Sequence, residues 1–404
     1  PTVTENNGSK AQNRTYQDLL KNPNDVYNFK QLSQSELIKI NVNGENKTWL
    51  PTRMYKNIQL SPNGKLILLD FIKTPFSYIV PYNRFPTETH VYDINGELIR
   101  VINDAPLLEE LPKGFMSTTT GKRNFRWRND KPSTLSFTIA LDGGDPSNMI
   151  EYRDALYQWE APFNDSPVFL TKVKNRISGI YWGNSQTAII TDRWWNTRNT
   201  KTYVFNPSDP DIQSKIINDR NYQDVYNDPG RFIQRKNKYN KSVLLLDKNT
   251  AFTIGNGFTK SGQFPFIDKI NLSDGESERY YQSSYKDKYE NIIDLDLNKN
   301  EILVRIESPS EYPNYYINSL NTNQLNQLTF FQNPYKSLEN IEKKIISYKR
   351  DDGLDLNGVL YLPKNSSTMI DKKPMILWAY PREYKDKSSA SQKTNNPNRF
   401  IYPS

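Results

Sequence analysis

The chain has 404 residues, of which 36% are hydrophobic and 24% charged, so it is long enough for two or three average domains. It contains no cysteine and one histidine, which excludes disulfides, a cysteine nucleophile and zinc sites built from thiolates or several histidines. The net charge of +8 comes from scattered basic residues, and no apolar run is long enough to cross a membrane as a helix. Composition therefore excludes several kinds of site without assigning a function.

The N-terminal part, residues 1–50, carries weak signals only. Residues 1–14 are polar and rich in asparagine, which is typical of a frayed end. The sequence begins at Pro1 without the features of a leader, which indicates that a leader was removed or that the sequence was shortened. Weak helical patterns at Tyr16–Leu20 and Gln34–Ile38 predict short helices within a tail or linker.

From Pro51 onward one pattern recurs: a short apolar run, a polar turn and a second apolar run. This pattern is typical of a β-hairpin, and the aromatic residues, 13% of the chain, also favour strands. Five such hairpins have turns spaced 66, 55, 64 and 51 residues apart, with further hairpins between them. The spacing indicates four-stranded sheets arranged radially, a β-propeller, with an array of β-sandwiches as the structural alternative. The five turns are centred on Asn63, Asn129, Asn184, Lys248 and Lys299, and the further hairpins span 90–99 and 315–325.

The pattern changes after residue 340. A hairpin with an Asp-Gly turn at Gly353 leads to an unbroken apolar run, Met375–Trp378, with a proline on either side. Such a run is typical of a strand buried on both faces of an α/β sheet. The sequence stops at Ser404, before an α/β domain could be completed. Residues 341–404 are therefore predicted to be the first strands of an incomplete α/β domain.

Three local patterns resemble binding sites but favour ordinary structure. The basic cluster 235–241 precedes an apolar strand, which favours a solvated sheet edge over a phosphate-binding track. Residues 294–298 resemble the start of a calcium loop, but Lys299 stands where that loop requires glycine, so a hairpin turn is favoured. The Asp-Gly-Gly-Asp sequence at 142–145 is typical of a left-handed turn. No metal, cofactor or nucleic acid is therefore expected to bind.

Taken together, these elements resemble the prolyl oligopeptidase family of serine peptidases, and most closely its glutamyl endopeptidase-like branch. The resemblance implies a seven-bladed propeller at 51–340 that covers an α/β-hydrolase domain, of which 341–404 are the truncated beginning. It also implies Ser-Asp-His catalysis on peptides, with the serine on a Gly-x-Ser-x-Gly elbow. The segments that carry it are Pro75–Pro86, Ala140–Pro146, Tyr181–Gly183 with Arg193–Trp195, and, most specifically, Trp378–Lys387.

The sequence departs from this family at the catalytic residues. It contains no Gly-x-Ser-x-Gly, and its single histidine, His90, lies within the predicted propeller. A triad needs a serine, a base and a carboxylate that converge in one place, so this chain is not expected to hydrolyse peptides by itself. The leading hypothesis is the propeller part of a peptidase that cleaves peptides, after glutamate as the branch implies. The alternative is a non-catalytic propeller that acts as a binding module.

The resemblance assigns one catalytic role, to Tyr380, whose hydroxyl would donate to the oxyanion of the tetrahedral intermediate. The alternative is a strand-end tyrosine that packs. Arg382 and Arg193 are candidates for binding a glutamate carboxylate, because arginine binds carboxylates in a bidentate manner; the alternative for both is an ion pair. The expected partners are a peptide substrate of the intact protein and a second copy, joined through the incomplete hydrolase strands. The family suggests an exported or periplasmic location.

Overall fold

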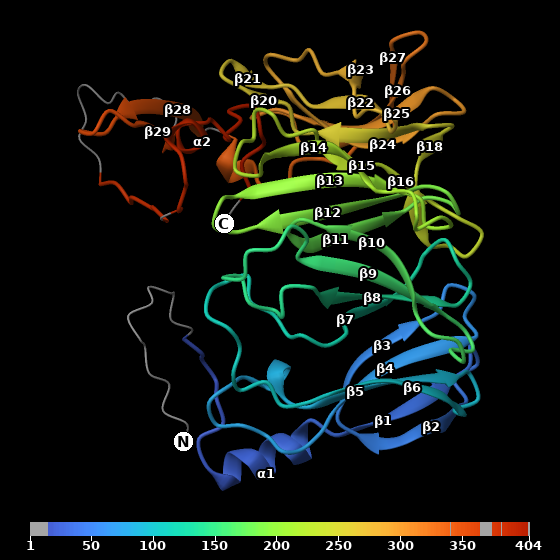
Figure 1. Cartoon of the computed structure of the whole chain (residues 1–404). Helices are drawn as coiled ribbons and strands as arrows, with labels where there is room; N and C mark the ends of the chain where they lie inside the picture. Colours follow the sequence, from blue (N-terminus) through green and yellow to red (C-terminus); the bar gives the residue numbers. More distant parts are fainter. Residues whose placement is uncertain (1–14, 340, 364–373, 381, 403–404) are drawn as a thin grey trace. The chain divides into compact units, whose positions relative to one another are not determined.

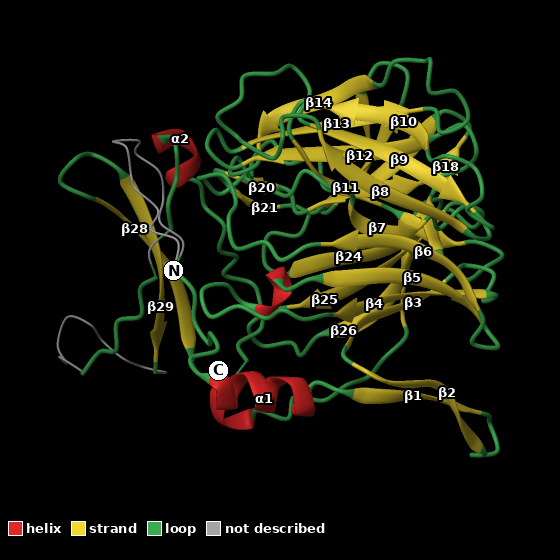
Figure 2. Ribbon diagram, turned by 60° about the horizontal axis from the view of Figure 1, so that its bottom comes forward, coloured by secondary structure: helices red, strands yellow, loops and turns green. Residues whose placement is uncertain are grey.

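The computed structural model describes residues 15–339, 341–363, 374–380 and 382–402. Strands account for most of the ordered elements, so the chain is mainly β, as predicted (Figure 2). Its contacts divide it into two compact units. The first comprises Pro1–Trp195, Thr200–Ile216 and Arg235–Leu244, and the second Asn196–Asn199, Ile217–Gln234 and Leu245–Ser404.

Five sheets of four or five strands form the body of these units (Figure 1). Neighbouring strands in these sheets are antiparallel and most are consecutive in the chain, and the prediction of five recurring hairpins is confirmed. In spatial order the sheets are β3 (Tyr55–Leu60), β4 (Leu66–Ile72), β5 (Thr87–Asp93), β6 (Leu98–Ala105); β10 (Val168–Val173), β9 (Asp154–Glu160), β8 (Thr134–Ala140), β7 (Arg123–Trp127); β11 (Arg176–Trp182), β12 (Ala188–Trp194), β13 (Asn199–Phe205), β14 (Lys215–Asn221); β15 (Arg231–Phe232), β19 (Thr250–Gly255), β22 (Phe266–Asn271), β23 (Ser277–Gln282), with β18 (Leu246–Asp247) beside β19; and β24 (Tyr289–Asp296), β25 (Glu301–Glu307), β26 (Asn314–Ser319), β27 (Gln324–Gln327).

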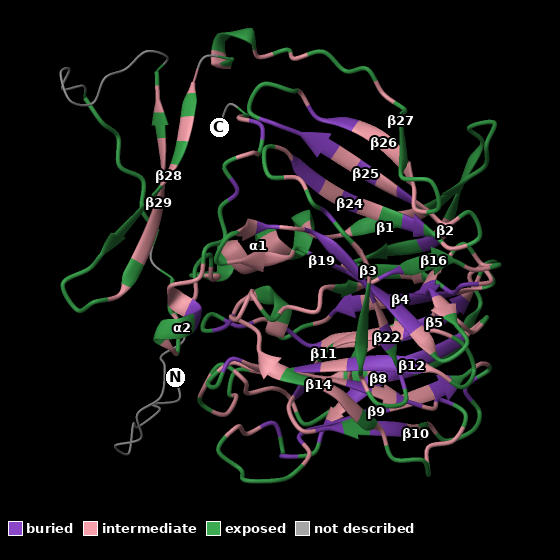
Figure 3. Cartoon of the chain, turned by 90° about the horizontal axis from the view of Figure 1, so that it is seen from above, coloured by how far each residue is buried: buried purple, intermediate pink, exposed green. Residues whose placement is uncertain are grey.

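Successive sheets within a unit share hydrophobic cores. In the first unit, Leu68 of β4 shares one core with Phe137 of β8, and Leu156 of β9 shares another with Ile190 of β12. In the second unit, β19 and β22 share a core with β24 and β25. The strands at these cores, such as β8, are buried along most of their length, whereas outer strands such as β6 and β27 are largely exposed (Figure 3). Burial on both faces explains why the inner strands have unbroken apolar runs.

Turn residues set where the hairpins reverse. Lys248 and Asn300 have φ of +52° and +56°, and Gly64 has φ of +71°. Left-handed backbone at these positions matches the polar and glycine-containing turns that the sequence indicated. The seven blades that the resemblance implies are not confirmed, because the described residues contain five sheets of four or more strands.

The two short helices predicted near the N-terminus are wrong. Tyr16 and Leu20 lie outside any helix and pack against a core formed by Ile72, Val80 and Phe85. The other segment is a strand, because its backbone pairs with that of a neighbouring strand: β1 (Ser35–Ile40) pairs with β2 (Asn46–Arg53).

The helix lies between the two predicted segments, at α1 (Pro23–Leu32). Asn22 caps it by accepting a hydrogen bond of 3.0 Å from the Asp25 amide, and Pro23 occupies the first turn, where its missing N–H costs nothing. This Asn-Pro start signal is visible in the sequence and outweighs the weak apolar periodicity on either side. None of the helices in the described ranges is long and apolar enough to cross a membrane.

The C-terminal part differs from the prediction of a buried strand. The hairpin with the Asp-Gly turn is confirmed, but Met375–Trp378 forms no strand, and its four side chains are 73, 96, 80 and 88% exposed. The described residues offer this run no neighbouring strand, so its backbone has no ladder to join. The remaining elements are β28 (Glu342–Lys349), β29 (Asp355–Leu362), α2 (Lys387–Ala390), η1 (Tyr82–Arg84), η2 (Lys336–Leu338), β16 (Gln234–Lys236), β17 (Ser242–Leu244), β20 (Phe258–Thr259) and β21 (Gly262–Gln263).

Candidate functional site

Two of the three predicted site residues, Tyr380 and Arg382, belong to the second unit. Tyr380 is 81% exposed, and Arg382 is exposed as well. Neither side chain lines the cavity formed by described residues of the first unit. Both groups are presented to solvent by the part of the second unit that the structure describes.

The residues that follow are held firmly within the same unit. The Gln223 side chain donates to the Glu383 carbonyl at 2.6 Å and accepts from the Lys385 amide at 3.2 Å. Asn221 donates to Asp386 at 2.8 Å. Arg198, which is 3% exposed, lies 3.4 Å from the Glu383 carboxylate. These contacts fix the chain three residues beyond Tyr380.

A second anchor lies at Gln392. Its Oε1 accepts from the Val225 amide at 2.8 Å, and its Nε2 donates to Asp224 at 2.8 Å. Burial raises the pKa of the Asp224 carboxyl, but hydrogen bonds from Asn227 and Gln392 outweigh it and hold that pKa below its ordinary value. The 221–226 loop thus binds the C-terminal segment through charged and amide groups rather than apolar packing.

Arg193, the third predicted residue, belongs to the first unit. It is exposed on β12, directly opposite Arg176 of β11. Its neighbour Trp194 stacks under the Arg153 guanidinium at 4.2 Å, and Trp195 lies 4.4 Å from Phe115 between ring centroids. Arg193 thus belongs to a different unit from Tyr380 and Arg382, and its contacts are those of the first unit.

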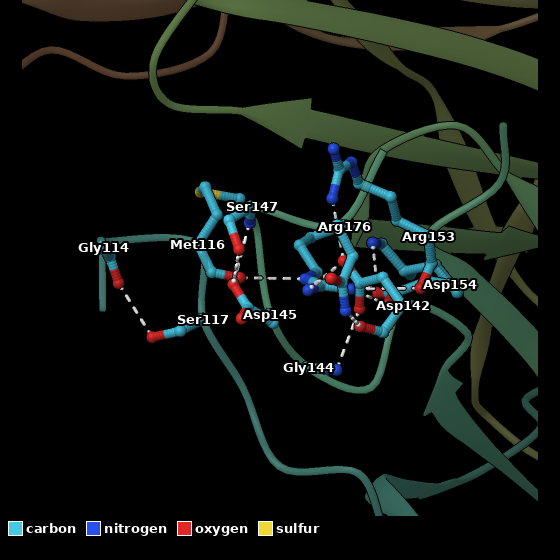
Figure 4. Close-up of polar contacts among 12 residues, drawn as sticks. Gly114, Met116, Ser117, Asp142, Gly144, Asp145, Ser147, Arg153, Asp154 and Arg176 are labelled. Atoms are coloured by element: carbon cyan, nitrogen blue, oxygen red, sulfur yellow. Dashed lines mark hydrogen bonds and ion pairs between the residues drawn. The ribbon is translucent and has the colours of Figure 1, made fainter. Parts of the chain in front are cut away.

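Beside this strand lies a buried network of ions (Figure 4). Arg176 donates to Asp142 at 2.7 Å, to Asp154 at 2.9 Å and to the Met116 carbonyl at 2.9 Å. Arg153 also donates to Asp142, at 2.9 Å, and both carboxylates are fully buried. Because both carboxylates in the network are paired with arginines, we interpret it as a structural network and not as a ligand-binding site.

Sequence reasoning missed this network. Its bonded pairs of acid and arginine are 11, 22 and 34 residues apart, and only the pairing of strands brings them together. One feature of the sequence could have indicated the network: a charged residue directly before apolar residues of a strand. Asp154 is such a residue, and it precedes the buried Ala155 and Leu156. A charge in such a place needs a partner.

The Asp-Gly-Gly-Asp turn belongs to the same region, and its prediction is confirmed. Gly143 and Gly144 have φ of +67° and +75°. A Cβ on Gly144 would lie 2.0 Å from the Thr118 carbonyl oxygen, so no other residue fits. The Gly144 amide donates to Asp142 at 3.0 Å, which places that carboxylate in front of the arginines.

The other two look-alike patterns are ordinary structure, as predicted. Residues 294–298 lead into the β24–β25 turn, where Asp296 accepts from the Asn298 and Lys299 amides at 3.0 and 3.2 Å. Most cations of the basic cluster are exposed along β16, with Lys241 half-buried.

His90 is a packed side chain of β5 and is 6% exposed. Its Nδ1 lies 3.2 Å from the Tyr92 hydroxyl, and its Nε2 lies 3.0 Å from Glu88. Burial lowers the pKa of the imidazole below 6.5, although Glu88 acts in the opposite direction. The single histidine of the sequence is therefore packed within a sheet, where burial disfavours its charged form.

An NMR titration of His90 should give a midpoint below pH 6.5. The chain has one histidine, so its ring signal is unambiguous. Since the folded-state pKa lies below the unfolded one, this group's contribution to stability should be lost as the pH falls below 6.5. The Glu88→Gln variant should lower the midpoint further, because it removes the charge that favours the imidazolium. A midpoint at or above 6.5 in the folded chain would contradict this prediction.

The chain is similar in sequence to two plant proteins that are named as peptidases. Over 418 aligned residues, 99% of the chain, it is 35% identical to "Probable glutamyl endopeptidase, chloroplastic" of Oryza sativa subsp. japonica. It is 32% identical, again over 99% of its length, to the protein of the same name from Arabidopsis thaliana. The chain is homologous to glutamyl endopeptidases. The resemblance to the glutamyl endopeptidase-like branch of the prolyl oligopeptidase family is thereby confirmed.

The chain spans less than half the length of these relatives, 45% of the rice protein and 43% of the Arabidopsis protein. No family model matches it. Among solved structures, it is similar to an acylaminoacyl peptidase of Pyrococcus horikoshii, with 14% identity, coverage of 79% of this chain and 45% of the other, and a TM-score of 0.41. It is also similar to a putative dipeptidyl aminopeptidase IV of Bacteroides ovatus, with 12% identity, coverage of 79% of this chain and 45% of the other, and a TM-score of 0.45. Scores this low add nothing to the functional argument.

Proposed function

We propose that the chain is the propeller part of a serine peptidase that hydrolyses peptides after glutamate. The observation that carries the proposal is the sequence identity of 35% over 99% of the chain to a protein named as a glutamyl endopeptidase. The five sheets, which share cores in succession within each unit, are in keeping with propeller blades.

In this proposal the sequence of 404 residues contributes three parts to the intact protein. Residues 1–50 form an N-terminal tail or linker, 51–340 the β-propeller, and 341–404 the first strands of the incomplete α/β-hydrolase domain. The propeller restricts access to a Ser-Asp-His site that other residues supply, since this sequence contains no Gly-x-Ser-x-Gly.

The test is an assay of a protein that contains this chain and extends to the length of the plant relatives. We expect it to react with a fluorophosphonate and to cleave model peptides after Glu in preference to Gln. The chain of 404 residues, assayed in parallel, should do neither. An intact protein that fails both assays would favour a binding module without catalysis.

The glutamate preference should depend on an arginine. Replacing Arg382 by leucine should lower kcat/KM for Glu peptides roughly 10- to 100-fold, the value of one hydrogen bond to a charged group, and leave Gln peptides unaffected. The same substitution at Arg193 tests the second candidate independently. Arg100, an exposed arginine of β6, provides the control. An unchanged ratio of Glu to Gln cleavage in a variant would remove that arginine from the site.

A further inference from the structure

A cavity of about 720 Å³ lies within the first unit and has no role in the proposed catalysis. Its walls come from β3, β7, β8, β9 and β11, together with Asn129 and Lys241. Two indole side chains, Trp127 and Trp182, line it and are themselves 6 and 5% exposed. Arg128 stacks on the Trp182 ring at 4.1 Å and is fully buried, so this wall is rigid. A volume of this size, with fixed walls, is typical of a ligand site.

The charges on the cavity wall have one sign. Arg126 and Lys241 line it, and no aspartate or glutamate does so. Neither cation forms an ion pair with any residue in the described ranges, and the Arg126 side chain is exposed. Two unpaired cations that face the same space favour an anion there, because no acid of the wall competes for them.

The neutral part of the wall is polar enough to bind a peptide. Six uncharged polar side chains contribute to it, and two of them, Asn124 and Thr138, make no side-chain hydrogen bond to another described residue. Amides and hydroxyls of this kind can pair with a peptide backbone, which has a donor and an acceptor at every residue. A small anion would leave these groups and most of the volume unused.

We propose that this cavity binds an acidic segment of a peptide, with Arg126 and Lys241 each holding a carboxylate and the neutral polar groups holding the backbone. That the ligand is a peptide rests on the proposed function. The site differs from the candidate glutamate pocket at the scissile bond, because its residues belong to β7 and to the 237–241 turn. It would retain acidic substrates or products within the sheets of the first unit.

The test is fluorescence anisotropy with a short fluorescein-labelled peptide rich in Glu, measured on the chain of 404 residues at low ionic strength. The same peptide with Gln for Glu should bind more weakly. Arg126→Gln and Lys241→Gln should each raise the Kd of the acidic peptide roughly tenfold, as expected for one lost charge-assisted contact, and together roughly 100-fold. The matched controls, Arg100→Gln and Lys65→Gln, change exposed cations of the same unit and should have no effect.

Several outcomes would overturn the site. These are equal affinity for the Glu and Gln peptides, variants that bind as the unmodified chain does, and binding of inorganic phosphate with no binding of the peptide. Near-ultraviolet circular dichroism of each variant shows whether it is folded, which we expect because Arg126 is exposed. The assay needs no hydrolysis, so it is independent of the peptidase test. If the intact protein is an active peptidase but the chain does not bind the acidic peptide, only the cavity proposal is wrong. If the chain binds the acidic peptide but the intact protein is inactive, only the proposed function is wrong.

Discussion

Replacing Arg176 by methionine should lower the free energy of unfolding of the first unit by about 3–5 kcal/mol, because it removes one cationic partner from each of two buried carboxylates and leaves each with a single arginine. The guanidinium donates to Asp142 and Asp154, whose side chains are 0 and 1% exposed. It also satisfies the Met116 and Arg153 carbonyls, at 2.9 and 3.0 Å. Methionine fills a similar volume, so the loss would come mainly from charge and hydrogen bonding rather than from a cavity.

Urea denaturation followed by tryptophan fluorescence measures this change. Six of the seven tryptophans lie in the first unit, and the seventh, Trp378, is already 88% exposed. The fluorescence change therefore reports mainly on the unit that contains Arg176. The same substitution at Arg100, an exposed arginine on an outer strand, should cost less than about 0.5 kcal/mol. A loss below about 1 kcal/mol at Arg176 would show that the acids find other partners or water.

In the intact protein, Tyr380→Phe should reduce kcat by about 10²- to 10³-fold with little change in KM. The proposed role of the hydroxyl is to donate a hydrogen bond to the oxyanion as its charge develops, an interaction that is strongest in the transition state. Phenylalanine keeps the ring and its packing and removes only the donor. Hydrolysis of a Glu peptide by the intact protein, measured over a range of substrate concentrations, separates the two constants.

The control for this substitution is Tyr384→Phe, four residues further along the same segment. It should retain kcat, since no role in the oxyanion site is proposed for it. A normal kcat for Tyr380→Phe would show that the tyrosine packs or is solvated instead. In the present structure its side chain is 81% exposed, so the proposed role requires residues outside this chain to enclose it.

Local patterns predicted the sheets well and the termini poorly. The five turns, from Asn63 to Lys299, were found because a polar turn between two apolar runs is a signal contained within about a dozen residues. At Gln34–Ile38 the same reasoning failed, because a strand there depends on pairing with Asn46–Arg53 rather than on its own periodicity. For Met375–Trp378, an apolar run indicates burial only if another element covers it. No described element does so.

For the candidate site residues, too, the sequence indicated some features and only the structure showed the others. A resemblance between segments selected Tyr380, Arg382 and Arg193 as candidates, yet it could not say what surrounds them. The anchoring of residues 383–393 by the 221–226 loop joins parts of the chain about 160 residues apart, and no sequence spacing predicts such a contact. The same holds for Lys241, which belongs to a basic cluster in the sequence but lines a cavity in the structure.

The sequence by itself determined that the chain is mainly β, where its hairpins turn, that it contains no Gly-x-Ser-x-Gly, and that it resembles the glutamyl endopeptidase-like branch of the prolyl oligopeptidase family. These properties depend on local patterns or on similarity along the chain. The tertiary structure alone decided which acids pair with Arg176, that Met375–Trp378 lies exposed, and that two cations share a cavity without an acid. Burial and charge pairing are set by groups that are distant in sequence, so they become visible only when the strands are placed side by side.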